Sequence, residues 1–158
     1  MSPVISDTYL KIQTARANAA LPAAGAWDAT PTEMICPGYW NFSLHFNYSR
    51  GAAAGAFDFQ IQTTPWSRTA DVPAGINEWE TQAIYSSGAV AAGADTTSNI
   101  QAELISYTNT AAGDLSFIYG PVALDGAVER MRVRCRESGV VGTPGECYCL
   151  ARFRDEEG

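Results

Sequence analysis

Residues able to carry out acid–base or nucleophilic chemistry are scarce in this chain. Its one histidine, His45, stands at a polar position of an alternating segment, where a solvated or hydrogen-bonded role is expected. The sequence contains neither the G-x-S-x-G pattern of serine hydrolases nor a P-loop, a dinucleotide-binding glycine pattern or a His-Glu-x-x-His zinc pattern. We therefore expect a protein that is not an enzyme and has no catalytic residues.

Metal ligands are equally sparse. Cys147 and Cys149 flank Tyr148, but the second cysteine or histidine pair of a structural zinc site is missing. The aspartates lie mostly near turns, where this residue bonds its own backbone: Asp58, Asp71, Asp95, Asp114 and Asp125. Nothing else indicates secretion, so we expect reduced thiols at Cys36, Cys135, Cys147 and Cys149. The sequence thus predicts neither a metal nor a cofactor.

Two groups of side chains are candidates for binding a partner. Six of the ten basic residues are arginines at alternating positions near the C-terminus: Arg130, Arg132, Arg134, Arg136, Arg152 and Arg154. They form either a solvated strand face that offsets nearby acids or a contact between subunits. Trp66 and Trp79 flank a loop rich in Pro, Ser, Thr, Asp and Gly, and they either cap one end of the core or form a sugar-binding surface.

The elements that must position these residues are strands. From Trp40 to Tyr48, aromatic and aliphatic residues alternate with polar ones, which predicts a half-buried strand. A small-residue turn follows, and the alternation resumes in Phe57, Phe59 and Ile61. We expect these two segments to form a β-hairpin.

A second strong pair of strands lies at the C-terminus. Residues 130–136 alternate arginine with Met131, Val133 and Cys135, and residues 147–153 alternate Cys147 and Cys149 with polar or aliphatic residues. If these strands pair, the three thiols share the core face and the six arginines share the opposite face.

Weaker strand candidates are residues 8–15, 79–85, 99–107 and 115–119. The total of about eight strands predicts an all-β fold, an antiparallel β-sandwich or jelly roll. A short helix in residues 28–34 or 88–94 stays open. We expect residues 1–20 to be an N-terminal arm or first strand, and residues 21–158 to be a single β-sandwich domain.

Composition narrows the class of partner. The 158 residues are 46% hydrophobic and 17% charged, with a net charge of −7 that would repel nucleic acid. No run of about 20 apolar residues or signal peptide occurs, so we expect neither membrane insertion nor export other than release by lysis. The low fraction of charged residues favours a protein part of whose surface is buried against other proteins.

Two stretches resemble a family of tailed-phage and prophage virion proteins with jelly-roll domains. Residues 40–51 look like the family's aromatic strand followed by a basic residue and glycine. Residues 132–139 and 142–145 look like its terminal hairpin, with an arginine-rich strand, an acidic-glycine turn and a Pro-Gly exit. Together they cover about a third of the chain, and the cysteines depart from the small or aliphatic residues usual in that hairpin.

The resemblance implies a virion structural protein, assembled in the host cytoplasm. It would decorate or cement the capsid, bind the major capsid protein or other virion proteins, and form a symmetric oligomer, with a homotrimer favoured. The alternative is a carbohydrate- or receptor-binding β-sandwich module of a fibre or accessory domain, which would use Trp66 and Trp79.

Overall fold

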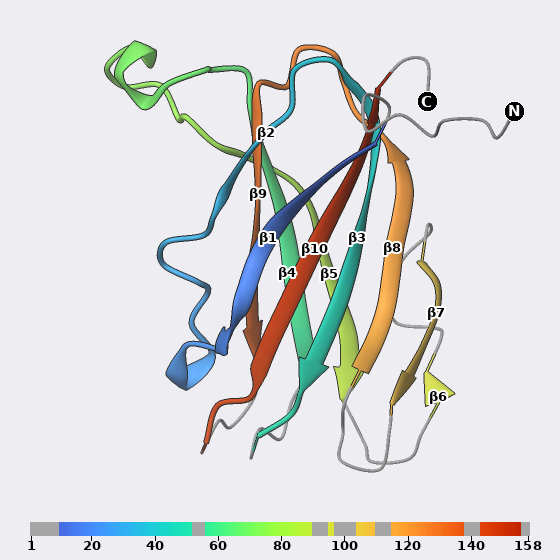
Figure 1. Ribbon diagram of the computed structural model, residues 1–158. Coiled ribbons are helices and arrows are strands. Elements are labelled where there is room, and N and C mark those ends of the chain that lie inside the picture. Colours follow the sequence, from blue (N-terminus) through green and yellow to red (C-terminus); the bar gives the residue numbers. More distant parts are fainter. Residues whose placement is uncertain are drawn as a thin grey trace, which may run out of the picture.

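The computed structural model describes residues 10–51, 56–89, 95–96, 104–109, 115–137 and 143–155 (Figure 1). In these ranges the chain forms ten strands, two short 3-10 turns and no α-helix, and no helical segment is long and apolar enough to cross a membrane. The strands are β1 (Leu10–Ala20), β2 (Glu33–Ile35), β3 (Tyr39–Ser49), β4 (Ala56–Thr64), β5 (Glu80–Ala89), β6 (Asp95–Thr96), β7 (Leu104–Asn109), β8 (Leu115–Ala123), β9 (Arg130–Glu137) and β10 (Glu146–Asp155).

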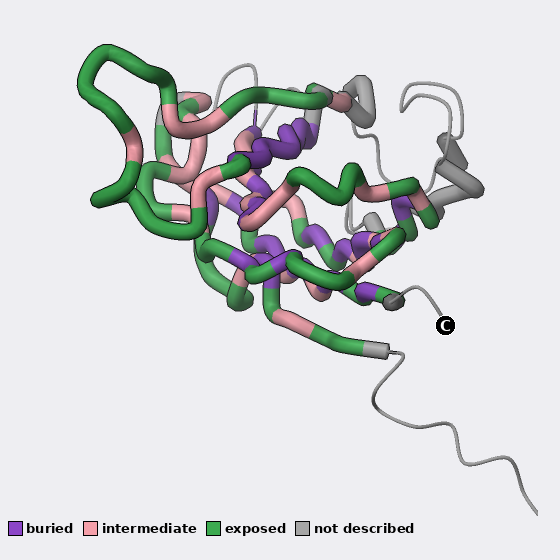
Figure 2. The backbone as a smooth tube through the Cα atoms, turned by 90° about the horizontal axis from the view of Figure 1, so that it is seen from above, coloured by how far each residue is buried: buried purple, intermediate pink, exposed green. Residues whose placement is uncertain are grey.

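The strands form two antiparallel sheets that pack against each other, which confirms the predicted all-β sandwich. One sheet has six strands in the order β1-β10-β3-β8-β7-β6, and the other has four in the order β2-β9-β4-β5. Seen from above in Figure 2, buried stretches follow one another with intermediate and exposed ones along the strands, and the loops are mostly exposed.

The strand order is that of a jelly roll. If β6 and β7 are set aside, the hydrogen-bonded pairs include β1 with β10, β2 with β9, β3 with β8 and β4 with β5. The first of these eight strands therefore pairs with the last, the second with the seventh, and so on inward. This nesting is what results when one long antiparallel hairpin is rolled up into two sheets.

Alternation along β3 builds the centre of the core. Phe42, Leu44, Phe46 and Tyr48 are buried, and the polar residues between them point outward. The ring of Phe46 lies 4.5 Å from that of Phe59 on β4 and 4.8 Å from that of Phe117 on β8. Aromatic packing thus joins the two sheets.

Both predicted hairpins are wrong. β3 and β4 belong to different sheets, as do β9 and β10, so each pair faces across the core instead of sharing hydrogen bonds. Alternation determines which side of a strand is buried, and both arrangements bury the same side. The loop after β3 and the loop before β10 also lie close together, because a Cβ atom added at Gly51 would collide with the carbonyl oxygen of Thr143.

Two smaller expectations also differ from the structure. Trp40 was placed on the apolar face, but it is 56% exposed, because β3 has one extra residue there between Tyr39 and Asn41 in its pairing with β10. Residues 28–34 form no helix and lead into β2, and the alternative helix at 88–94 begins in β5 and otherwise lies outside the described residues. Residues 10–20 form the first strand; residues 1–9 are not described.

Candidate functional site

The six arginines do not share one face. Arg130, Arg132, Arg134 and Arg136 lie on β9 of the four-stranded sheet, whereas Arg152 and Arg154 lie on β10 of the six-stranded sheet. In both strands the residues between them, such as Cys135 and Phe153, are buried in the core. The arginines therefore point away from the core on opposite sides of the sandwich.

Arg130 is buried and fixed by groups of its own chain. Its Nε donates to the carbonyl oxygen of Trp66 at 2.8 Å, and its two terminal nitrogens bind Glu33 at 2.9 Å and Glu78 at 2.6 Å. Hydrogen bonds from Thr69 and Arg130 lower the pKa of Glu78 below its ordinary value. Such a guanidinium stabilises the loop between β4 and β5 rather than offering a contact to a partner.

The next three arginines of β9 also have partners within the chain. Each Nε donates a hydrogen bond: Arg132 to Gln62 at 2.7 Å, Arg134 to the carbonyl oxygen of Asp28 at 2.9 Å, and Arg136 to Asp58 at 2.9 Å. Arg136 also stacks on Trp27, with 4.3 Å between the guanidinium carbon and the ring centroid. This row resembles the solvated, charge-balanced strand face that was one of the two sequence interpretations.

The two tryptophans of the alternative sugar-binding hypothesis both contact arginines of β9. The guanidinium carbons of Arg132 and Arg130 lie 4.2 and 5.1 Å from the ring centroid of Trp79. Trp66 is half-buried and contributes its carbonyl oxygen to Arg130. Both residues thus hold the β4–β5 loop against β9.

A different surface stands out on the outer side of the six-stranded sheet. Register places Thr14, Leu150, His45 and Ile118 in one row across β1, β10, β3 and β8. The adjacent row consists of Tyr148, Asn47 and Ser116. We call these two rows the neutral face; its seven residues are Thr14, His45, Asn47, Ser116, Ile118, Tyr148 and Leu150.

No carboxylate or permanent cation belongs to the neutral face, which spans four strands. Its histidine is hydrogen bonded over 3.5 Å to the hydroxyl of Ser43, and burial and then the charge of Arg152 lower the pKa of His45 below its ordinary value. His45 is therefore neutral at pH 7. Along β10 the charged residues lie at the two ends, with Arg152, Arg154 and Asp155 at one end and Glu146 at the other. Beyond Ser116 the second row continues through Thr108 on β7 to Asp95 on β6.

The neutral face is hollowed. A groove of about 460 Å³ runs between the side chains of β3, β8 and β10 and includes His45, Ile118 and Leu150. A second groove of about 440 Å³ continues from it past Asn47 and Tyr148 toward Asn18 of β1, and Glu146 lines its outer end. Depletion of charge together with an apolar and aromatic centre is typical of the core of a protein–protein interface.

The sequence did not lead to a prediction of the neutral face, because the arginines were the stronger signal for a contact. The available signal was the alternation in β10, where Tyr148 and Leu150 stand between the buried residues Cys147, Cys149 and Ala151. An outward tyrosine and leucine in a chain with sparse charge indicate a covered surface, but the strands that extend the face come from distant parts of the sequence.

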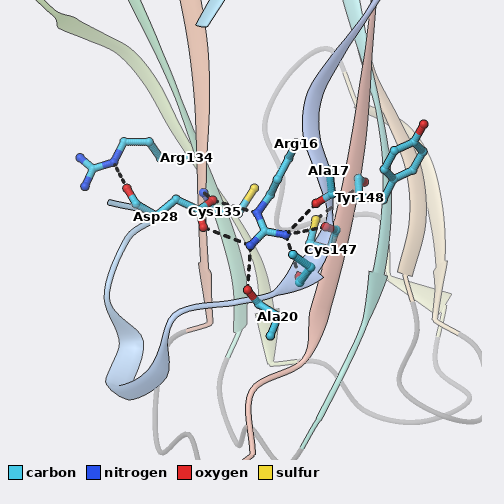
Figure 3. A network of polar contacts seen from close by, with 9 residues as sticks. Arg16, Ala17, Ala20, Asp28, Arg134, Cys135, Cys147 and Tyr148 are labelled. Carbon is cyan, nitrogen blue, oxygen red and sulfur yellow. Dashed lines mark hydrogen bonds and ion pairs between the residues drawn. The ribbon is translucent and has the colours of Figure 1, made fainter. Parts of the chain in front are cut away.

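The edge of the sandwich beside this face is closed by an arginine (Figure 3). Arg16 of β1 forms a two-point ion pair with Asp28, with distances of 2.9 and 3.1 Å. The same guanidinium donates to the carbonyl oxygens of Ala20 and Cys147 at 3.0 and 2.5 Å. Asp28 in turn accepts the backbone N–H of Cys135 at 3.0 Å, so the pair connects the six-stranded sheet to β9.

The four cysteines are free and buried in the described structure. Burial raises the pKa of Cys36 to about 12 and raises those of Cys135 and Cys149 well above their ordinary value. Among the described residues, no three His, Cys, Asp or Glu side chains are grouped to hold a metal ion. The thiols therefore act as small core residues.

Comparisons with protein-family models, curated proteins and solved structures find no match for this chain.

Proposed function

We propose that this chain is a structural protein of a tailed-phage virion, and that it reinforces the capsid by binding other virion proteins, further copies of itself included, through its neutral face. The observation that carries the proposal is the uncharged, grooved surface across β1, β10, β3 and β8. A sheet face that stays in water normally carries charged and polar residues between its buried ones. The absence of charge from these two rows where they cross β1, β10, β3 and β8 favours a surface covered by protein.

Two further features agree with a decoration protein. The jelly-roll strand order provides a rigid scaffold in which the core, not the binding face, holds the sheets together. The net charge of −7 keeps such a chain soluble until it docks. A fold hosts many functions, however, so the proposal depends on the face and on the resemblance of residues 40–51, 132–139 and 142–145, not on the jelly roll alone.

The arginine row has a smaller part in this proposal than in the sequence analysis. The four arginines of β9 have partners in their own chain and lie on the other sheet. Of the six arginines, Arg152 and Arg154 are the two that lie on the same sheet as the neutral face. We assign these two to the rim of the contact, where charged side chains change the rate of association more than the affinity.

The decisive experiment is the protein composition of virions from the phage or prophage that encodes the chain. We expect the chain in gradient-purified particles at a fixed ratio to the major capsid protein, and we expect particles lacking it to release their DNA at a lower temperature. Its absence from the particles, or its presence in a few copies with unchanged heat stability, would contradict a reinforcing role.

A further inference from the structure

The sandwich has a second hollow, distant from the neutral face. It opens between the sheets where β4 and β5 face the end of β8 and the turn that follows. Its volume is about 530 Å³, within the range of cavities that enclose a small organic molecule. The opening lies at the β5 and β8 side of the sandwich, and no residue of the neutral face lines it.

The pairing of β8 with β3 is irregular beside this opening. Leu44 pairs with Tyr119 and Phe42 pairs with Val122, so two residues of β8 stand opposite one residue of β3. A bulge of this kind bends the strand and redirects the side chains that follow it. Here Val122 and Leu124 turn toward the opening and contribute to its lining.

The inner wall of the cavity is aromatic. Phe42 and Tyr119 are buried, and the rings of Tyr119 and Tyr85 lie 4.7 Å apart, with their hydroxyl oxygens separated by 2.5 Å. Ile61 and Val128 complete the apolar part. An aromatic wall of this type suits a flat or compact apolar group and attracts a cation that approaches a ring face.

The rim of the cavity is acidic. Glu80 and Asp125 both line it and are exposed, and Asp125 accepts a hydrogen bond from the backbone N–H of Ala127 at 2.8 Å. None of the described residues that line the cavity is a lysine, arginine or histidine. Two carboxylates at the entrance of an aromatic cavity, in a chain with a net charge of −7, favour a positively charged occupant.

We propose that this cavity binds a small organic cation that has an aromatic or branched apolar body. The body lies against Tyr85, Tyr119 and Phe42, and the cationic group remains at the mouth near Glu80 and Asp125. The site would give the protein a binding activity independent of its proposed assembly function, because the cavity and the neutral face have no residue in common.

The test uses three probes of similar shape and different charge: benzyltrimethylammonium, benzyl alcohol and phenylacetate. Binding to the full chain is followed by amide chemical shifts in ¹H–¹⁵N NMR spectra. We expect the cation to bind about tenfold more tightly than the alcohol, with shifts around the cavity and no saturable shifts for phenylacetate. Equal affinity for the cation and the alcohol would indicate a merely apolar occupant and would overturn the proposal, as would no binding of the cation.

Removing the charges of Glu80 and Asp125 tests whether these two acids attract the cation. In the double variant Glu80→Gln/Asp125→Asn we expect the cation to lose its advantage over the alcohol, with the affinity for the alcohol unchanged. The matched control, Asp71→Asn/Glu146→Gln, removes the same charge from exposed positions outside the cavity and should retain the advantage. If both double variants weaken the cation equally, the net charge rather than the cavity attracts it, and the site is refuted.

Filling the cavity gives an independent check. Ala127 is exposed and lines the mouth, so Ala127→Trp should block every probe without disturbing the core. The circular dichroism spectrum and the unfolding temperature show whether this variant is folded. Undiminished cation binding by a folded Ala127→Trp variant would place the probe elsewhere and overturn the proposal.

Discussion

The hydroxyl of Tyr48 donates a hydrogen bond of 2.5 Å to Oε2 of Glu137 inside the core. Tyr48 is on β3 of the six-stranded sheet and Glu137 is on β9 of the four-stranded sheet, and the other carboxyl oxygen accepts the backbone N–H of Gly145 at 2.8 Å. One buried acid thus connects both sheets with the loop that precedes β10. Burial and this carboxylate raise the pKa of Tyr48 above its ordinary value, so the hydroxyl keeps its proton.

The first prediction concerns this bond. Tyr48→Phe should lower the free energy of unfolding by about 1–3 kcal/mol, because the buried carboxylate of Glu137 loses a hydrogen-bond donor. The double variant Tyr48→Phe/Glu137→Gln should lose less than the sum of the two single variants, since the tyrosine and the acid act together. Urea denaturation followed by fluorescence measures both. Strict additivity of the single variants would show that the bond contributes nothing.

The second prediction concerns Arg16. Its guanidinium bonds Asp28 and several carbonyl groups at once, and an ammonium group has too few donors in the wrong geometry to replace it. Arg16→Lys should therefore lower the free energy of unfolding by about 2 kcal/mol although the charge is kept. The control is Arg68→Lys, whose exposed pair with Asp71 should change stability by less than about 0.5 kcal/mol. Similar losses in the two variants would contradict this account of the edge.

These two cross-sheet links mark the limit of sequence reasoning here. Alternation predicted which sides of β3, β4, β9 and β10 face the core, because apolar residues recur there with a two-residue period. It did not predict that the polar side of β4, with Asp58 and Gln60, is buried as well. It could not predict which strands pair, since Phe46 packs equally well against Phe59 within one sheet or across two. The structural role of Arg16 could not be predicted from the sequence, because it depends on the irregular pairing of β1 with β10 and on a turn that brings Asp28 close to Arg16.

The same limit applies to the candidate site. Placing Arg130–Arg136 and Arg152 on one face required β9 and β10 to be neighbours in a sheet, and the rolled topology puts them on opposite sheets. The neutral face was equally hidden, because Ile118 and Leu150 become neighbours only through β3 between them. The local pattern identifies which residues point outward, but the order of the strands decides which of these residues lie next to one another.

The third prediction follows from the buried thiols. Because burial keeps Cys36, Cys135 and Cys149 protonated at neutral pH, the native chain should react with a disulfide reagent such as DTNB only as fast as it unfolds. In guanidinium chloride all four cysteines should titrate at once. Rapid reaction of the native chain, or fewer than four thiols after denaturation, would contradict the structure.

The fourth prediction tests the neutral face as a contact between protein subunits. Ile118→Arg places a charge in the centre of the face, where an unpaired, desolvated cation would be costly, and should lower the oligomeric mass measured by light scattering. Ile84→Arg is the matched control, because Ile84 is 60% exposed on the other sheet, compared with 39% for Ile118. We expect a trimer for the unmodified chain and for the control. An unchanged mass for Ile118→Arg, or equal loss in both variants, would refute the face as the subunit contact.

The last prediction is a pH dependence that comes from His45. Its ring faces Ser43 on its own strand, Leu150 and Arg152 on β10, and Ile118 on β8, and no carboxylate is among these neighbours. Burial first and Arg152 second lower its pKa in the folded chain below the ordinary value of 6.5, so the unfolded chain takes up the proton at a higher pH. The stability that neutral His45 allows is thus complete above that value. It is lost as the pH falls through 6.5 toward the folded-state pKa.

Comparison with His45→Gln isolates this effect, because every other titrating group is common to the two chains. The free energy of unfolding of the unmodified chain, relative to that of the variant, should fall between pH 7.5 and pH 5.5, and urea denaturation at the two values measures it. A constant difference would mean that the pKa of His45 is the same in the folded and unfolded chains. A difference that grows on acidification would mean that the folded chain favours the charged ring, through a neighbour other than Arg152. The neutral face would then carry a charge under mildly acidic conditions, and its description as a protein contact would have to include an acidic partner.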